Sequence, residues 1–441
     1  MVRIGLMPKR ILHVHRRKFL AGLGVAVVVR ALPRIAVAET PQSWLLAAKP
    51  GTIALRPGSA TPVWSFQGTE QAPRFKRGSQ LEVIFQNDLP VPAVLDFRGL
   101  DGAPAAEPLT SLAPVAPGAK AGFAVPLRQA GTFFCSLGLL GDGAARPTRP
   151  LPFVVEENEP VNVDRDEVFL VEDWRLRADG TAVAPGLDPQ DAALIYTVNG
   201  RISPDITVRS HERLRFRFIN GCQRQVIALK IETPEVRVMA LDGAPSEPFL
   251  ARNGALVLAP GGRADVFIDA AAQPGSAAEI LLHDGSAARP IARLQISAEP
   301  QIRPAPLPPA AALPSDGLPA QLDLKGALRA DLALGGPEWM PPANFAISAA
   351  PVFQAKASRT VVLALVNRAD SATVFHLHGH HFRLLDRLDD GWKPFWLDTL
   401  AVEPGQTQRI AFAADYAGRW LVESVGTGWT APRLVRWYGV G

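Results

Sequence analysis

Short stretches in which hydrophobic and polar residues alternate recur along most of the chain. Residues 81–87 (LEVIFQN), 214–220 (LRFRFIN) and 361–367 (VVLALVN) are the clearest, and each ends in asparagine. Successive side chains of a strand point to opposite faces of a sheet, so a period of two predicts strands that bury one face. Long stretches with a helical period are missing from the sequence. The pattern therefore predicts an all-β protein.

The strand that ends in asparagine belongs to a unit that occurs three times. A Pro-Gly pair follows each one, at 117–118, 260–261 and 404–405, and precedes another alternating stretch. The three asparagines are 133 and 147 residues apart, which is close to the length of one domain. We therefore expect three consecutive Greek-key β-sandwich domains, at residues 39–157, 158–298 and 336–441. Residues 299–335 begin with a proline-rich stretch and are interpreted as a linker.

The first 38 residues have the pattern of an export signal rather than of a folded element. Arg16-Arg17 lies before an apolar run from Phe19 to Val29, and Ala36-Val37-Ala38 is a small-x-small cleavage site before Glu39. An apolar run of this length is too short to span a bilayer as a helix, which takes about 20 residues. The paired arginines predict a twin-arginine signal peptide, and hence export to the periplasm.

Removal of residues 1–38 changes the charge of the chain. That segment holds eight Lys or Arg and no acid, whereas the whole chain has 46 basic and 42 acidic residues. The mature chain is therefore slightly acidic, and its charge does not indicate a nucleic-acid partner. We also expect no membrane span in the mature chain.

Two cysteines, Cys135 and Cys222, remain in the mature chain. An oxidising compartment permits a disulfide between them. We favour two buried thiols in separate domains, and the pairing stays open because spacing alone cannot fix it.

Several motifs, in their order along the chain, resemble those of multicopper oxidases, and the resemblance covers essentially the whole mature chain. It implies three cupredoxin domains, with copper sites in the third domain and at the interface of the first and third. The motifs are 64–68 (WSFQG), 131–134 (GTFF), 196–200 (YTVNG), 375–380 (FHLHGH), 398–399 (DT), 403–405 (EPG) and 418–420 (GRW).

Most of the copper ligands that this resemblance implies are replaced in this chain. Asp96-Phe97-Arg98-Gly99 stands where the family has His-Trp-His-Gly, and Ser136-Leu137-Gly138 where it has His-Ser-His. Thr373 occupies a further histidine position. Of the implied ligands only His376 and His378 remain. The C-terminal His-Cys-His, its later histidine and its axial methionine correspond to Glu423-Ser424-Val425, Trp429 and Leu434.

A count of residue types leads to the same conclusion. The mature chain has six histidines, fewer than the eight that the family's three-copper cluster implies, and no cysteine follows Cys222. A blue copper site needs a thiolate together with two imidazoles. The electron relay of the family therefore cannot be assembled. The family is one of oxidoreductases, but the ligand set argues against oxidase activity, and we assign no catalytic residue.

The remaining histidines leave two interpretations of the site. His376 and His378 are two residues apart, so both face the same side of a strand. Together with Asp96 and Glu423 they could hold a single residual metal, and copper is the candidate.

The alternative is that Asp96, Arg98 and Glu423 bond to one another and to the histidines, and so fill the cavity. We favour this second interpretation, because a guanidinium is always charged and repels a cation.

Three other groups of residues are interpreted as structural. His380 is expected to make a polar contact at the strand end, and His381 to lie at the surface. The row Arg213, Arg215 and Arg217 is interpreted as a solvated sheet face, with a partner-binding patch as the alternative. The aromatic side chains of Trp392, Phe395 and Trp396 are expected to fill the core.

The function that these observations favour is that of an exported, non-catalytic scaffold with a periplasmic protein partner and no cofactor. In this respect the chain is similar to the copper-free, exported cell-division protein of bacteria within the same family, which implies a role in the cell envelope or in division. The alternative function is that of a copper-binding protein or reduced oxidoreductase with one metal at the strand of His376 and His378.

Overall fold

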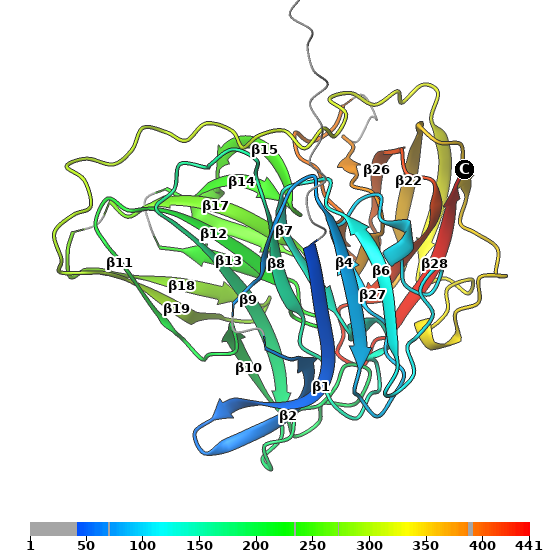
Figure 1. Ribbon diagram of the computed structural model, residues 1–441, viewed down its shortest axis with the longest axis horizontal. Helices are drawn as coiled ribbons and strands as arrows, with labels where there is room; N and C mark the ends of the chain where they lie inside the picture. The colour runs from blue at the N-terminus through cyan, green and yellow to red at the C-terminus, as the bar shows by residue number, and fades with distance from the viewer. Residues whose placement is uncertain (1–41, 69–70, 233–234, 272, 387–390) are drawn as a thin grey trace, which may run out of the picture. The chain divides into compact units, whose positions relative to one another are not determined.

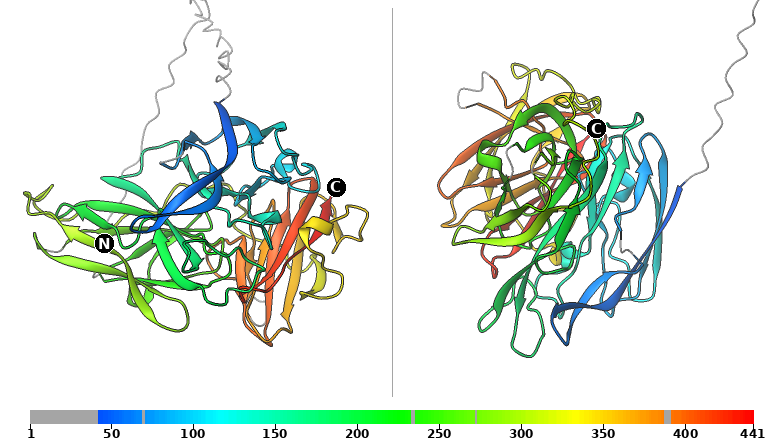
Figure 2. Two further views of the ribbon diagram at one scale, coloured as in Figure 1. Left: turned by 90° about the horizontal axis from the view of Figure 1, so that it is seen from below. Right: turned by 90° about the vertical axis from the view of Figure 1, so that its left-hand side faces the viewer.

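Strands make up nearly all of the regular secondary structure in the described residues of the computed structural model (Figure 1). The structure describes residues 42–68, 71–232, 235–271, 273–386 and 391–441. The predicted signal peptide, residues 1–38, and Glu39 lie outside the described residues. The strands of each third of the chain gather into a group of their own, as the colours in Figure 1 and Figure 2 show. The all-β prediction with three consecutive sandwiches is therefore confirmed.

The first sandwich consists of two four-stranded sheets, with strand orders β2-β1-β4-β6 and β3-β8-β7-β5. Aromatic side chains fill the space between them, with Trp44, Phe97 and Phe153 in contact. The elements are β1 (Gln42–Arg56), β2 (Ser59–Phe66), β3 (Arg74–Lys76), β4 (Gln80–Asn87), β5 (Asp96–Arg98), η1 (Pro104–Ala106), β6 (Lys120–Pro126), β7 (Gly131–Ser136), η2 (Gly138–Leu140) and β8 (Leu151–Glu156).

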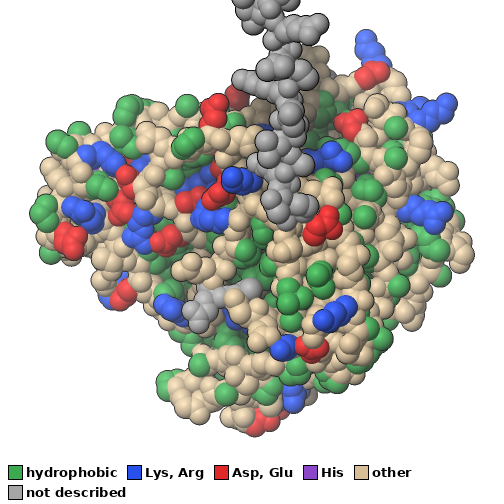
Figure 3. All heavy atoms as spheres, viewed as in Figure 1, with side chains coloured by type: hydrophobic (Ala, Val, Ile, Leu, Met, Phe, Trp, Pro, Cys, Tyr) green, Lys and Arg blue, Asp and Glu red, His purple; other side chains and the backbone are tan. Residues whose placement is uncertain are grey.

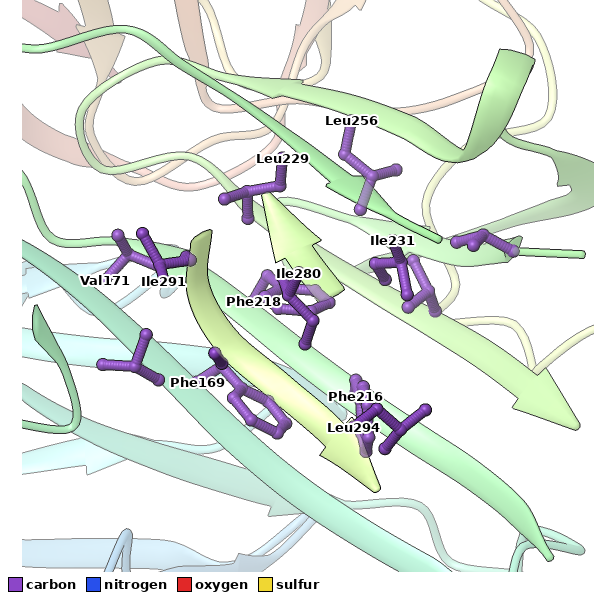
Figure 4. Close-up of a cluster of buried hydrophobic side chains, with 14 of the residues drawn as sticks. Phe169, Val171, Phe216, Phe218, Leu229, Ile231, Leu256, Ile280, Ile291 and Leu294 are labelled. Carbon is purple, nitrogen blue, oxygen red and sulfur yellow. The ribbon is translucent and has the colours of Figure 1, made fainter. Parts of the chain in front are cut away.

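The second sandwich packs a six-stranded sheet, β10-β9-β12-β17-β14-β15, on a five-stranded sheet, β11-β19-β18-β13-β16. Its core joins Phe169, Phe216 and Phe218 of one sheet to Leu229 and Ile280 of the other (Figure 4). The elements are β9 (Arg165–Leu176), β10 (Ala193–Val198), β11 (Asp205–Val208), β12 (Arg213–Asn220), β13 (Ile227–Ile231), β14 (Arg237–Leu241), β15 (Ala244–Leu250), η3 (Arg252–Gly254), β16 (Ala255–Leu258), β17 (Arg263–Asp269), β18 (Ala277–His283) and β19 (Ala288–Ile296).

The third sandwich consists of the sheets β20-β22-β26-β24 and β21-β28-β27-β23-β25. Phe375, Phe412 and Tyr438 lie in its core. The elements are β20 (Leu328–Leu334), η4 (Pro342–Asn344), β21 (Gln354–Ala355), β22 (Arg359–Asn367), β23 (Thr373–Leu377), β24 (Arg383–Leu384), β25 (Thr399–Val402), β26 (Thr407–Ala414), β27 (Gly418–Gly426) and β28 (Arg433–Val440).

The repeated asparagine has the same structural role in each sandwich. The Asn87 side-chain amide donates to the carbonyls of Val91 and Val115, and its backbone carbonyl accepts from Gly118 of the Pro-Gly turn. The amides of Asn220 and Asn367 likewise donate to two carbonyls each, and their backbone carbonyls accept from Gly261 and Gly405. These glycines have φ between 69° and 90°, a region that favours glycine. The repeated sequence pattern thus corresponds to a hydrogen bond that joins two turns in each sandwich.

The predicted linker, residues 299–335, ends in a strand. Residues 328–334 form β20, which pairs in parallel with β22. The third sandwich therefore begins before residue 336, within the range interpreted as linker. Other domain boundaries stay predictions. None of the helices in the described residues has the length and apolar character needed to cross a bilayer.

The prediction of a solvated arginine face on β12 is wrong. Arg213, Arg215 and Arg217 are at most 3% exposed. Arg213 binds Asp269 across the strand pair and donates to the carbonyls of Leu307 and Pro308 in the proline-rich segment. That segment covers Arg213, whereas Arg215 binds Glu157 and Arg217 donates to Thr132 of the first sandwich. Alternation within a strand gives no information about what covers its outer face.

Ion pairs also occur at the surface. The left-hand part of the face drawn in Figure 3 shows acidic and basic side chains next to one another. Arg293 and Asp205 form one such pair, in which both side chains are about half exposed (50% and 49%).

Candidate functional site

The strand of the two remaining histidines lies beside the strand that carries Glu423. His376 on β23 and Glu423 on β27 are direct cross-strand partners. The first sandwich reaches this place through β5 and the loop after it, where Asp101 bridges to Gly379. Sequence positions nearly 300 residues apart are thereby brought into one buried cluster.

Two glycines allow this close approach. A Cβ on Gly379 would lie 2.1 Å from the Trp420 ring, and one on Gly99 would lie 2.2 Å from Arg263 Nη2. Both also have positive φ, 72° and 93°. A larger residue at either position would push apart the segments that form the cluster.

Arg98 occupies the centre of the cluster and bonds to two carboxylates. Its Nε donates to Asp96 Oδ2 at 2.8 Å, and its Nη2 lies 2.5 Å from Glu423 Oε1. Arg433 donates to the other oxygen, Glu423 Oε2, at 2.6 Å. Asp96 and Glu423 are fully buried. Despite burial, the charges of Arg98 and Arg433 hold the pKa of Glu423 well below its usual range.

His378 is held between carboxylates on both of its ring nitrogens. Nε2 lies 2.8 Å from Glu423 Oε1, and Nδ1 lies 3.1 Å from Glu107 Oε1. Burial disfavours the charged imidazolium, but Glu107, Glu423 and Asp96 outweigh burial and raise the pKa of His378 to about 10. His378 is therefore a cation whose two N–H groups both donate to carboxylates.

His376 is the opposite case. Burial, followed by the charge of Arg98, lowers the pKa of His376 to about 4, so the ring is neutral. Its Nδ1 lies 2.9 Å from Thr399 Oγ1, which itself donates to Asp398 Oδ1. Thr399 must then accept from Nδ1–H, and the lone pair of His376 resides on Nε2.

These contacts decide how well the cluster fits a metal. Among the described residues, one set of side chains is spaced closely enough to share a metal ion: ligand atoms of His376, His378 and Glu423 lie within 4.8 Å of one another. A metal needs unprotonated donors with unused lone pairs. His378 is protonated, and both Glu423 oxygens accept from cations, so only His376 offers a free lone pair. Asp96 stands apart from the group and bonds to Arg98.

The residues present therefore do not fit the copper cluster that the resemblance implies. A guanidinium fills the place of a ligand, and the carboxylates that could have replaced histidines are used to neutralise it.

The two histidines that follow are both buried. His380 Nδ1 lies 2.7 Å from the Tyr438 hydroxyl, in agreement with the predicted polar contact. The prediction of a surface position for His381 is wrong, because this side chain is 3% exposed. Its Nδ1 lies 2.9 Å from Asp101, and its Nε2 lies 2.8 Å from the carbonyl of Asp242 in the second sandwich.

Arg263 joins the three sandwiches near His381. This fully buried guanidinium of the second sandwich forms a bidentate pair with Asp398 of the third, at 2.9 and 2.7 Å. It also donates to the carbonyl of Thr132 in the first sandwich and to that of Asp242 in its own.

Sequence reasoning missed several members of this site. Glu107, Asp398 and Arg433 contact the predicted residues, but none falls at a ligand position of the resembled family. The Asp398-Thr399 motif was noticed only as part of the resemblance. Their signal in the sequence is weak, because Glu107 is one of 42 acidic residues and Arg433 is one of 46 basic residues.

Both cysteines are buried free thiols, as the favoured interpretation has it. Burial raises the pKa of each well above its ordinary value. Of the aromatic residues expected in the core, Trp396 is buried, and Trp392 and Phe395 are partly exposed.

Comparisons with known proteins agree with this architecture. A family model described as multicopper oxidase matches residues 318–432. No curated protein matches the chain.

Solved structures match over the described length. A multi-copper oxidase from Pseudomonas thermotolerans is 25% identical with a TM-score of 0.78, over 91% of this chain and all of that one. Lac15 from a marine microbial metagenome is 24% identical with a TM-score of 0.74, over 91% and 100% of the two chains. The McoA multicopper oxidase of Aquifex aeolicus is 15% identical with a TM-score of 0.73, over 91% and 98%. The chain is therefore multicopper oxidase-like: it has the fold of that family, and residues 318–432 match the family in sequence.

Proposed function

We propose that this chain is an exported, non-catalytic protein that uses the multicopper oxidase fold as a scaffold in the cell envelope. The observation that carries this proposal is the position of Arg98, within hydrogen-bond distance of Asp96 and Glu423. A guanidinium cannot be deprotonated in a protein. Copper would have to enter against this fixed charge, and Glu423 would have to leave its arginines to bind it.

Metal content tests the proposal directly. The mature chain is expressed with added copper, purified without chelator and analysed for copper and zinc. We expect far less than one metal ion per chain, and an identical result for the variant His376→Ala. Stoichiometric metal that His376→Ala abolishes would contradict the proposal.

A copper-binding function is the second candidate, and one observation favours it. Donor atoms of His376, His378 and Glu423 lie within 4.8 Å of one another, a spacing that one ion can bridge. Binding would require His378 to lose its proton and Glu423 to leave two arginines. Removal of those arginines should then improve binding. If the double variant Arg98→Met, Arg433→Met takes up copper and the unmodified chain does not, the arginine charges keep copper out of a metal site.

Export through the twin-arginine route is part of the same proposal and rests on Arg16-Arg17 and the apolar run after it. Replacement of both arginines by lysine should retain the protein in the cytoplasm with its leader attached, and replacement of Arg3 and Lys9 should not. Equal export of both double variants would contradict this route.

The role in the envelope is proposed from the resemblance to the copper-free division protein and from the lack of a complete copper ligand set. A scaffold of this kind should have a periplasmic protein partner. Cells that lack the chain should form filaments or lyse under envelope stress, and His376→Ala should restore normal division as well as the unmodified gene does. Normal division without the chain would refute the division role and leave the scaffold proposal standing.

A further inference from the structure

A small cavity remains where the three sandwiches meet, next to the filled ligand cluster. Its volume is about 50 Å³, and Arg98, Ser136, Gln223, His376, Glu423 and Arg433 contribute its polar lining. One water needs roughly 10–15 Å³ of such space, so three or four waters fit, or one molecule of three or four heavy atoms. The cavity is too small for an aromatic or a sugar substrate.

Two guanidinium groups supply hydrogen-bond donors to the cavity wall. Two guanidinium groups, those of Arg98 and Arg433, line it together with one carboxylate, that of Glu423. Both oxygens of Glu423 are already used, one by His378 and Arg98 and the other by Arg433. Asp96 pairs with Arg98 from outside the lining and offsets its charge. What the wall offers a ligand is therefore guanidinium N–H groups, with no carboxylate oxygen free of a cation.

Hydrogen-bond donors without acceptors point the same way. Arg433 Nε has no hydrogen-bond partner in the described part of the chain. Water cannot easily replace such a partner, because the Arg433 side chain is only 10% exposed. A buried N–H is rarely left unpaired, because it has lost its bonds to water. Ser136 Oγ accepts from the backbone N–H of Gly138, so its own proton is left for another acceptor.

We propose that this cavity binds a small monovalent oxyanion of the carboxylate class, of the size of formate, acetate or bicarbonate. Arg433 Nε–H and the Ser136 hydroxyl donate to its oxygens, and the guanidinium of Arg98 stabilises its charge. Planar, delocalised oxygens suit guanidinium donors. This site is independent of the proposed scaffold function, and it uses the positive charge that excludes a metal.

Calorimetric titration of the purified mature chain with EDTA present tests the site. Formate, acetate and bicarbonate are titrated separately at constant ionic strength, with chloride and sulfate as anions of other shape and charge. We expect one anion per chain for at least one of the three, weaker binding of sulfate, and no saturable binding of chloride. The three arms identify which member of the class fits best.

Matched variants separate a built site from general salt effects. Arg433→Lys keeps the positive charge near Glu423 but removes the Nε donor, and should weaken binding at least tenfold. Ser136→Ala removes one neutral donor and should weaken binding severalfold. Arg293→Lys, at an exposed pair with Asp205, is the control and should bind as the unmodified chain does.

The ligand-free melting temperature of each variant shows whether it is folded. If Arg433→Lys does not fold, Ser136→Ala carries the test alone, because that change leaves the charged cluster intact. The proposal fails if all three carboxylate-class anions leave the heat signal flat, if chloride binds equally well, or if folded Ser136→Ala and Arg433→Lys bind without change.

Discussion

Two buried arginine clusters in this protein differ in how completely they are paired. In the second sandwich, Arg215 and Arg217 share Asp265, and each binds a further carboxylate, Glu157 or Asp166. At the junction, Arg98 and Arg433 share Glu423 instead, but Asp96 Oδ1 and Arg433 Nε are left without partners in the described structure.

The difference follows from where the partners lie. Arg217 and Asp265 face each other on the adjacent strands β12 and β17, so the sheet itself sets their geometry. Arg98 and Glu423 belong to different sandwiches, and packing between domains must bring them together. A cluster whose central pairs are set within one sheet closes completely, with Glu157 after β8 and Thr132 on β7 as added partners. A cluster built only between domains keeps a cavity and unused donors. The second kind is where a ligand can bind.

The largest effect is expected from Arg98→Met. The change leaves Asp96 without its cation and removes one of the cations on Glu423, and breaking a buried pair in this way costs about 3–5 kcal/mol. The free energy of unfolding, from denaturant titration at neutral pH, measures it. A loss below about 1 kcal/mol would mean that the junction is hydrated and that Arg98 is not the group that neutralises it.

Arg217→Met should cost less, about 2–3 kcal/mol. Asp265 keeps Arg215 and the hydroxyl of Thr132 as partners, and Asp166 keeps Arg74. The same denaturant titration applies. If Arg217→Met proves as damaging as Arg98→Met, complete pairing gives no protection, and the distinction between the two clusters fails.

Asp173 tests what happens to a buried carboxylate that lacks a cation. Its Oδ2 has no partner in the described chain, and burial, opposed chiefly by the N–H of Gln223, raises its pKa to about 6. The folded state then holds its proton more tightly than the unfolded state does, so stability is lost as the pH rises from about 4 to about 6.

Asp173→Asn should remove that loss. Relative to the unmodified chain, the free energy of unfolding of the variant should rise by about 1–3 kcal/mol between pH 4 and pH 7. Denaturant unfolding titrations at several pH values in this range measure the difference. A difference that does not change with pH would show that Asp173 titrates normally.

The smallest effect is expected at the surface. Arg293→Ala breaks an exposed pair with Asp205 and should lower stability less than any of the buried replacements, and less again at high salt. Melting curves at low and high ionic strength measure it. A larger loss would show that exposure does not separate this pair from the buried ones.

Much of the fold could be predicted from the sequence because its signals are local. Alternation marks the strands, and the asparagine followed by a Pro-Gly pair marks each sandwich, since the two turns bond directly. The end of the linker was misjudged because β20 is stabilised by pairing with β22, which lies more than 20 residues further along the chain.

The candidate site was predictable in part. Asp96, Arg98, His376, His378 and Glu423 do meet, as the resemblance to the family implies.

Their outer partners were not predictable in the same way. His381 binds Asp101 and Asp242 in two other sandwiches, and Arg213 on β12 bonds to a segment nearly 100 residues away. Spacing within one strand contains no information about such partners.

Arg263 has a consequence for how the molecule comes apart. Its guanidinium binds the first and third sandwiches from within the second and is fully buried. Separation of the third sandwich from the second breaks a buried ion pair, and separation of the first removes a carbonyl acceptor from the same guanidinium. The three cores should therefore melt in one cooperative calorimetric transition, and a fragment ending after β19 should be aggregation-prone rather than an independent folding unit.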